Sequence, residues 1–151
     1  MALKTFAAIS IGSAVTEMKI FEFTSRRVMK EVDWISTRLG LGLDAYTMGR
    51  ISSRNVEELC RVLRDFARIM DGYKVNAYRA CATSAFRESR NMLILVDYIE
   101  KQTGLTIEVL SNSEQRFIDY QSIASVTTEF ESIIQNPAAI VDIGGSSMQV
   151  S

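Results

Sequence analysis

The distribution of apolar residues along the chain predicts strands at its start. Three apolar-rich segments stand at 6–11, 17–24 and 28–38, with turns at Gly12-Ser13 and Ser25-Arg26-Arg27 between them. The second segment alternates apolar and polar residues in part, as a strand with one buried face does. Because short turns join antiparallel neighbours, we expect these segments to form an antiparallel meander. A glycine-punctuated loop is predicted after it, over 39–44.

A helical period follows the meander. Apolar residues recur every three or four positions between Ser52 or Ser53, which can cap a helix, and Asp71-Gly72, which ends it. Further helices are predicted over 89–103 and from 113 to about 127, and further strands over 74–81, 106–110 and 138–142. A meander followed by alternating helices and strands predicts an α/β fold. We expect a mixed five-stranded sheet, antiparallel at first and then parallel, flanked by helices.

Composition places the chain among ordinary globular domains. Its 151 residues are enough for one domain with a core, and 47% of them are hydrophobic, 23% are charged and the net charge is -1. This balance gives no sign of a nucleic-acid or membrane-binding face. No apolar run approaches the ~20 residues of a membrane span, and the apolar start lacks the features of a signal peptide. We therefore expect a cytoplasmic protein.

The side chains available for chemistry narrow the function. The chain has no histidine, which excludes activation of a nucleophile by a histidine of this chain. Its two cysteines, Cys60 and Cys81, are too few soft ligands for a zinc site. We expect both of them to be reduced, buried thiols.

The most informative segment is 141–149, where a predicted buried strand ends in an acidic residue and a glycine turn. The apolar run 138–141 precedes Asp142, and Gly144 and Gly145 follow it. Backbone N–H groups of such a turn can bind phosphate, because glycine permits close approach of a ligand. The aspartate can hold a hydrated Mg²⁺ or orient a water beside it. The segment therefore predicts a phosphate-handling site.

Four stretches of the chain match a known family in their order and spacing. They are Arg38-Leu39-Gly40-Leu41-Gly42-Leu43-Asp44 with Gly49-Arg50-Ile51-Ser52, then Ala82-Thr83-Ser84-Ala85-Phe86-Arg87-Glu88 leading into Asn91, then 103–111 ending at Ser113-Glu114-Gln115-Arg116, and finally Asp142-Ile143-Gly144-Gly145. With them the chain resembles the N-terminal domain of the exopolyphosphatase and guanosine pentaphosphate phosphohydrolase family (Ppx/GppA). This family lies in the superfamily of sugar kinases, actin and heat-shock chaperones. The resemblance implies a ribonuclease H-like or actin-like ATPase domain over 1–151, the single N-terminal domain of a longer protein whose second lobe is absent from this chain.

The resemblance also implies a function and a set of site residues. In this family, water attacks the terminal phosphoryl group of inorganic polyphosphate or of guanosine pentaphosphate in a cleft between two domains. Glu114 is the expected catalytic base, and Arg87 would neutralise phosphate charge. Asp142 would bind Mg²⁺ through water. The phosphate would lie against two turns that contain Gly12, Ser13, Gly144, Gly145, Ser146 and Ser147.

The expected partners follow from this function. They are polyphosphate or guanosine pentaphosphate, with no nucleic acid and no membrane. A homodimer stays open, because dimers are common among relatives. The isolated fragment is expected to be inactive, since one wall of the cleft is missing from it.

The chain departs from the family pattern in both turns. Ser10 stands where the family usually has an aspartate, and Ser146 and Gln149 replace a glycine and a glutamate. Losing two carboxylates weakens Mg²⁺ binding. An alternative is therefore a catalytically weakened member that binds polyphosphate or nucleotide as a regulatory sensor. A sugar or acetate kinase fits less well, because the 83–87 stretch and Glu114 are not expected there.

Overall fold

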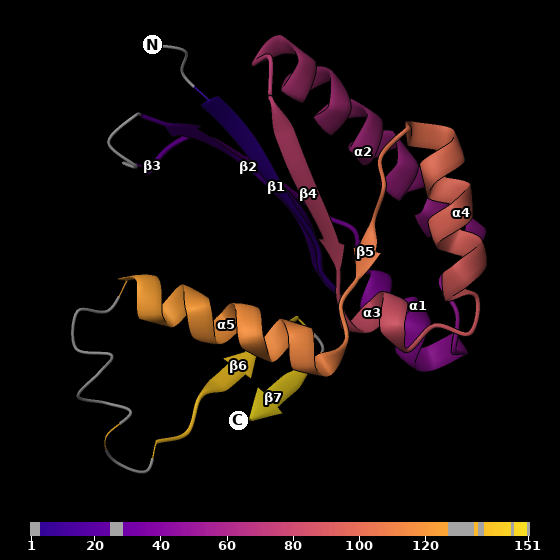
Figure 1. The fold of residues 1–151 in the computed structure, drawn as a ribbon. Coiled ribbons are helices and arrows are strands. Elements are labelled where there is room, and N and C mark those ends of the chain that lie inside the picture. Colours follow the sequence, from indigo (N-terminus) through magenta and orange to yellow (C-terminus); the bar gives the residue numbers. More distant parts are fainter. Residues whose placement is uncertain (1–3, 25–28, 127–134, 136–137, 146, 151) are drawn as a thin grey trace.

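The computed structural model describes residues 4–24, 29–126, 135, 138–145 and 147–150 (Figure 1). Its elements are, in chain order, β1 (Lys4–Ile11), β2 (Val15–Phe23), β3 (Met29–Arg38), α1 (Leu41–Met48), α2 (Ser53–Gly72), β4 (Ala77–Ala82), α3 (Ser84–Arg87), α4 (Met92–Thr103), β5 (Glu108–Val109), α5 (Asn112–Val126), β6 (Val141–Ile143) and β7 (Met148–Val150). None of the helices in the described ranges is long and apolar enough to cross a membrane.

The central sheet has five strands in the order β3-β2-β1-β4-β5. β1 pairs with β2 and β2 with β3 in antiparallel register, whereas β4 pairs in parallel with β1 and with β5. Parallel neighbours need crossover connections, which α2 and α4 supply along one side of the sheet (Figure 1). The predicted α/β class, with an antiparallel meander and then parallel strands, is confirmed.

The core lies between this sheet and the helices beside it. Every second residue of β1 and β2 is buried, among them Ile9, Ile11 and Met18. The amphipathic stripe of α2 packs against the same core through Leu63 and Phe66, which are at most 1% exposed. The Ser52 side chain accepts a hydrogen bond from the Asn55 N–H, so the predicted N-cap of this helix is present. Of the two free cysteines, Cys60 is buried in the core and Cys81 is half-buried.

The predicted loop over 39–44 is wrong, because α1 begins inside it. Gly40 and Gly49 adopt left-handed φ values of 66° and 67° and bound the helix at its two ends. A glycine at a helix end looks like loop sequence when only composition is considered. The helix is held in place by tertiary contacts, since the Gly42 N–H donates to the Ser13 carbonyl at 2.7 Å and Leu41 is fully buried.

The last predicted strand is also wrong in part, because it is neither buried nor joined to the main sheet. Among the described strands, β6 pairs with β7 alone, in a separate two-stranded sheet. Val141 and Ile143 are 52% and 76% exposed, and α5 has no buried residue. A strand is present where the apolar run predicts one, at Val141–Ile143, but the described residues provide no layer that covers it.

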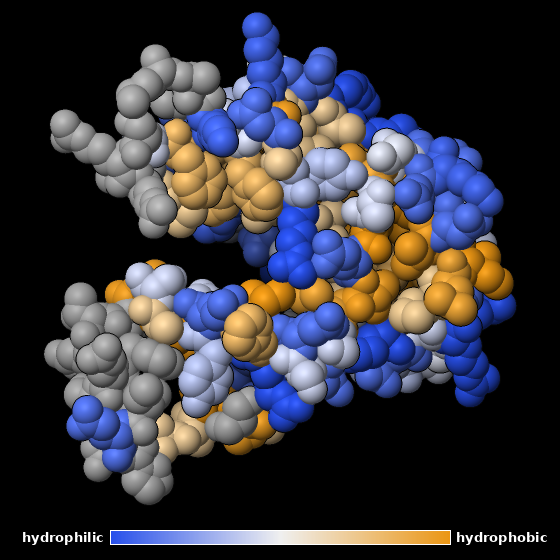
Figure 2. Space-filling model, in the orientation of Figure 1, coloured by the Kyte–Doolittle hydropathy of each residue, from blue (hydrophilic) through white to orange (hydrophobic). Residues whose placement is uncertain are grey.

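Figure 2 shows a deep indentation between the α5 side of the molecule and the sheet.

Truncation of the α2 stripe tests this description of the core. We expect Phe66→Ala to lower the free energy of unfolding by about 3–5 kcal/mol, because it removes a fully buried ring and leaves a cavity. Arg68→Ala is the matched control, since its side chain is 78% exposed on the same helix. That control is expected to change stability by about 0.5 kcal/mol or less. Equal effects of the two substitutions in urea unfolding would contradict the placement of α2.

Candidate functional site

Two hairpin turns of the same construction meet in the structure. In the turn between β1 and β2, the Gly12 N–H donates to the Val15 carbonyl at 2.9 Å. In the turn between β6 and β7, the Gly144 N–H donates to the Ser147 carbonyl at 2.8 Å. A Cβ atom added at Gly145 would lie 2.3 Å from the Cβ of Ala14, which is too close for any side chain. The glycine therefore permits the two turns to touch.

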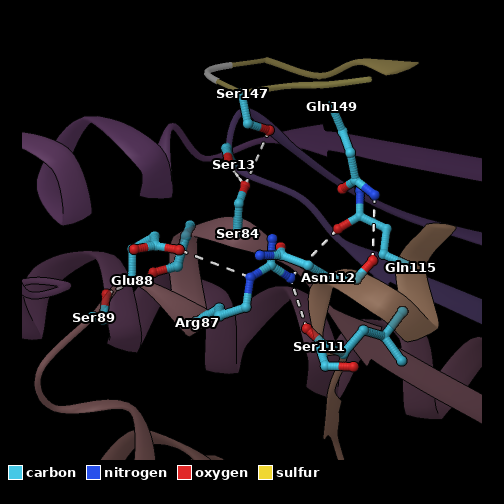
Figure 3. A network of polar contacts seen from close by, with 12 residues as sticks. Ser13, Ser84, Arg87, Glu88, Ser89, Ser111, Asn112, Gln115, Ser147 and Gln149 are labelled. Carbon is cyan, nitrogen blue, oxygen red and sulfur yellow. Dashed lines mark hydrogen bonds and ion pairs between the residues drawn. The ribbon is translucent and has the colours of Figure 1, made fainter. Parts of the chain in front are cut away.

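A chain of serine hydroxyls joins these turns to α3. The Oγ atoms of Ser13 and Ser84 are 2.8 Å apart, and Ser84 Oγ donates to Ser147 Oγ at 3.2 Å (Figure 3). Ser13 and Ser84 are 6% and 5% exposed. Burying a hydroxyl costs free energy unless it is hydrogen-bonded. The hydrogen bonds between these serines therefore stabilise the positions of the two turns and of α3 relative to one another. Three segments far apart in the sequence are thus held at one place.

A pocket of about 410 Å³ opens beside this serine chain. Its lining consists of two arginines, one glutamate, three amides, two hydroxyls, a tyrosine and a methionine: Arg87, Arg116, Glu88, Asn112, Gln115, Gln149, Ser84, Ser147, Tyr46 and Met148. Two guanidinium groups against one carboxylate leave the lining with an excess of positive charge. Such a lining suits an anionic ligand with several oxygen acceptors.

Arg87 is the most enclosed charged group of the pocket. Its Nη1 donates to the Leu110 carbonyl at 2.7 Å and lies 3.5 Å from Gln115 Oε1. Its Nε is buried without a hydrogen-bond acceptor, and the Glu88 carboxylate is 3.8 Å away. The side chain is therefore anchored to the loop before α5 while part of its donor capacity is unmet. A buried donor without an acceptor costs free energy, and an oxygen of a bound anion would lower this cost by accepting a hydrogen bond from Arg87.

Glu114 pairs with Ser111 at the start of α5. Its Oε2 accepts hydrogen bonds from the Ser111 N–H at 2.8 Å and the Ser111 Oγ at 2.7 Å, while its own N–H donates to Ser111 Oγ at 3.2 Å. This reciprocal pair is a capping box at the start of α5. The Ser111 backbone N–H, and then its hydroxyl, lower the pKa of Glu114. Glu114 does not line the pocket.

The next residue of α5, Gln115, is the one that faces the pocket. Its Nε2 donates to Asp142 Oδ2 at 3.2 Å and its Oε1 lies near Arg87. Close by, Gln149 Nε2 donates to the Asn112 carbonyl at 3.3 Å and connects β7 to the first turn of α5. Consecutive residues of a helix point about 100° apart. Glu114 is therefore directed to the cap of α5, while Gln115, one position later, is directed to the pocket.

The structure brings some of the expected site residues together. Arg87 and Ser147 line the pocket, and Asp142 reaches it through Gln115. Gly12 and Gly144 use their N–H groups inside their own turns. Ser146 lies outside the described residues.

Sequence reasoning did not identify Asn112, Gln115 or Arg116 as pocket residues. A helical projection from the capping pair Ser111 and Glu114 is the signal that would have found Gln115.

The expected Mg²⁺ site is sparse in its ligands. Asp142 is its one carboxylate, and Gln115 donates a hydrogen bond to it. Burial, and then the nearby Asp142 carboxylate, raise the pKa of Asp119, which is a second acidic group in the neighbourhood. In the described ranges no group of three or more His, Cys, Asp or Glu residues could hold a metal ion. These residues fit Mg²⁺ only if the phosphate oxygens of a ligand supply further positions.

The fold and the site define a class of protein, and comparison with known proteins gives its family. The sheet order and helices are those of an actin-like ATPase domain, with a cationic pocket at the meeting point of two glycine turns. The sequence profile of the Ppx/GppA phosphatase family matches residues 2–151. The chain belongs to this family.

Several relatives were found by sequence and by structure. Exopolyphosphatase 1 of Mycobacterium tuberculosis is 26% identical over 103 residues, which are 68% of this chain and 29% of the relative. The Aquifex aeolicus Ppx/GppA protein superposes with a TM-score of 0.80 at 23% identity, over 97% of this chain and 46% of that one. An exopolyphosphatase from Cytophaga hutchinsonii superposes with a TM-score of 0.83 at 24% identity, over 97% of this chain and 46% of that one. The chain thus spans less than half the length of these relatives.

The role of Ser111 predicts the titration of Glu114. Folding lowers the pKa of Glu114, so its ionised carboxylate stabilises the start of α5 at any pH above the pKa of the unfolded chain. This stabilisation is lost as the pH falls through the pKa of the folded chain. We expect a carboxyl NMR titration to give Glu114 a midpoint below its ordinary value. Ser111→Ala should raise this midpoint part of the way, because the backbone donor remains. An unchanged midpoint in that variant would contradict the capping box.

Proposed function

We propose that this chain forms one wall of a site for the terminal phosphate of inorganic polyphosphate or guanosine pentaphosphate, and that the site binds this anion while hydrolysing it slowly. The observation that carries the proposal is the lining of the pocket, which joins Arg87 and Arg116 to serine and amide donors. Membership of a phosphatase family supports a phosphorylated ligand. The name exopolyphosphatase of the mycobacterial relative favours a phosphoanhydride chain.

The pocket favours binding over turnover, because none of the described residues that line it is a free carboxylate. Glu88 is its one carboxylate and forms an ion pair with Arg87 at 3.8 Å. The three amides, Asn112, Gln115 and Gln149, can donate and accept hydrogen bonds but do not take a proton from water. A phosphate is therefore well matched by charge, whereas an attacking water is oriented only by neutral groups.

Mg²⁺ would enter this site with the ligand. The Asp142 carboxylate, which accepts a hydrogen bond from Gln115, would hold the Mg²⁺ ion through water, and oxygens of the phosphate would supply further ligands. The ion would neutralise charge on the phosphoryl group. The chain's own residues bind and orient the anion in this account: Arg87 and Arg116 by charge, and Ser84 and Ser147 by their hydroxyls.

A second candidate function is ordinary phosphohydrolase activity of the full-length protein. In that reaction the oxygen of a water forms a bond to the terminal phosphorus, and the bond from phosphorus to the bridging oxygen breaks. The shortened chain leaves with the electron pair, and the proton of the water passes to a base. Glu114, a carboxylate at the start of α5, favours this function. It would have to leave Ser111 to reach the pocket, and its lowered pKa weakens it as a base.

The test is binding and phosphate release by the full-length protein, with long-chain polyphosphate and guanosine pentaphosphate as separate probes and Mg²⁺ present. We expect saturable binding of at least one probe that weakens with salt, and slow phosphate release. Arg87→Ala should weaken binding about tenfold or more, and Arg87→Lys should weaken it less, because the charge remains while the paired donors are lost.

Two outcomes would decide against the proposal. Rapid release that Glu114→Gln abolishes would establish the second candidate function instead. Absence of saturable binding with both probes would remove both candidate functions.

A further inference from the structure

We propose that Gln115 is the positioning residue of this site: its side-chain amide joins Asp142 to Arg87 and sets the pocket for binding an anion in place of hydrolysing it. This inference rests on the proposed function and adds the residue that determines it. Gln115 comes from α5, Asp142 from β6 and Arg87 from α3, so the amide connects three elements. Figure 3 shows Gln115 beside Arg87.

The two neighbours of Gln115 have opposite charges, and only an amide satisfies both. Its Nε2 donates to Asp142 Oδ2 at 3.2 Å, and its Oε1 lies 3.5 Å from Arg87 Nη1. These partners fix the orientation of the amide, with nitrogen toward the carboxylate and oxygen toward the guanidinium. A glutamate at the same place would accept from Arg87 but would repel Asp142, since a carboxylate has no proton to donate at neutral pH.

The amide also fixes how charge is presented to a ligand. While Gln115 donates to Asp142, one carboxylate oxygen is directed toward α5 and is less available to oppose an incoming phosphate. On the other side, Arg87 is held by the Leu110 carbonyl and by Gln115. Asp142 and Arg87, which have opposite charges, are thus separated by one neutral side chain. This arrangement leaves the charge of Arg87 available to an anion.

A carboxylate at position 115 would change the chemistry of the pocket. It would stand beside Asp142, and two nearby carboxylates attract a divalent cation. It could take a proton from a water whose oxygen then bonds to the terminal phosphorus. The bond from phosphorus to the bridging oxygen would break, and the shortened chain would leave with the electron pair and recover the proton. The existing amide provides no such acceptor.

The test compares three variants of the full-length protein with the wild type. Gln115→Glu introduces the carboxylate, Gln115→Leu removes both hydrogen bonds, and Gln121→Glu makes the same charge change at an exposed position of the same helix. Long-chain inorganic polyphosphate with Mg²⁺ is the probe. Binding and steady-state phosphate release, as KM and kcat, are measured, and circular dichroism checks that each variant is folded.

We expect Gln115→Glu to raise both KM and kcat by about tenfold or more, because the new carboxylate repels the anion but accepts a proton from water. Gln115→Leu should weaken polyphosphate binding about tenfold, because Asp142 then faces the anion without its donor, and should leave release slow. Gln121→Glu should match the wild type in every measurement. A purely structural role of Gln115 would lower kcat in both variants.

The outcomes separate this inference from the proposed function. If the wild type binds polyphosphate and both substitutions at position 115 match it, the inference is overturned while the proposed function stands. If Gln115→Glu is unfolded, the Gln115→Leu binding measurement decides alone, and unchanged binding overturns the inference. If the wild type binds neither polyphosphate nor guanosine pentaphosphate, both are overturned together.

Discussion

The arrangement of the site depends on the contact between two glycine turns around one buried serine. The Ser84 hydroxyl donates a hydrogen bond to Ser147 in the second turn and shares another with Ser13 in the first. Gly145 makes the approach of the turns possible, because a Cβ there would overlap Ala14. Without this contact, β6 and β7 would lose this connection to α3, and the position of Ser147 and Gln149 in the pocket wall would depend on the hydrogen bonds of Asp142 and Gln149 to α5. The hydroxyl chain is thus the constraint that assembles the pocket from distant parts of the sequence.

The chemistry of the pocket follows from what surrounds this constraint. α3 and α5 place arginines there, and the first turn of α5 and strand β7 place amides. Three carboxylates nearby have another partner: Glu114 caps α5, Asp142 accepts from Gln115 and Glu88 pairs with Arg87. A phosphatase fold that has its positive charges in place and its carboxylates engaged is suited to hold a phosphate anion. The departures at Ser10 and Gln149 act in the same direction, because each removes a negative charge where the family pattern has one.

Much of the fold could be predicted from the sequence, since hydrophobic periodicity reports local structure directly. The meander, α2, α4 and α5 follow from it, and the family resemblance is confirmed. α1 was missed because its glycines are helix ends stabilised by contact with Ser13, which is distant in sequence. The burial of Val141 was predicted wrongly, because an apolar run reports what a strand can bury and not whether a covering layer is present.

The site could be predicted only in outline. Arg87, Ser147 and Asp142 were identified from their motifs, and the structure brings them near one pocket. Glu114 was placed by its spacing to Arg116, but spacing along a helix gives a face only after the start of the helix is known. The hydrogen bonds between Ser111 and Glu114 define that start, and they turn Gln115 toward the pocket. Whether Glu114 acts in catalysis stays a prediction.

The most direct test of the central claim is an NMR titration of the full-length protein with inorganic tripolyphosphate, observing backbone amides and arginine side chains. If the two turns and α3 form one anion site, the resonances of Ala14, Ser147 and the Arg87 side chain will move together and saturate at one ligand concentration. Movement confined to exposed arginines such as Arg50 and Arg90, with no change at either turn, would contradict the account.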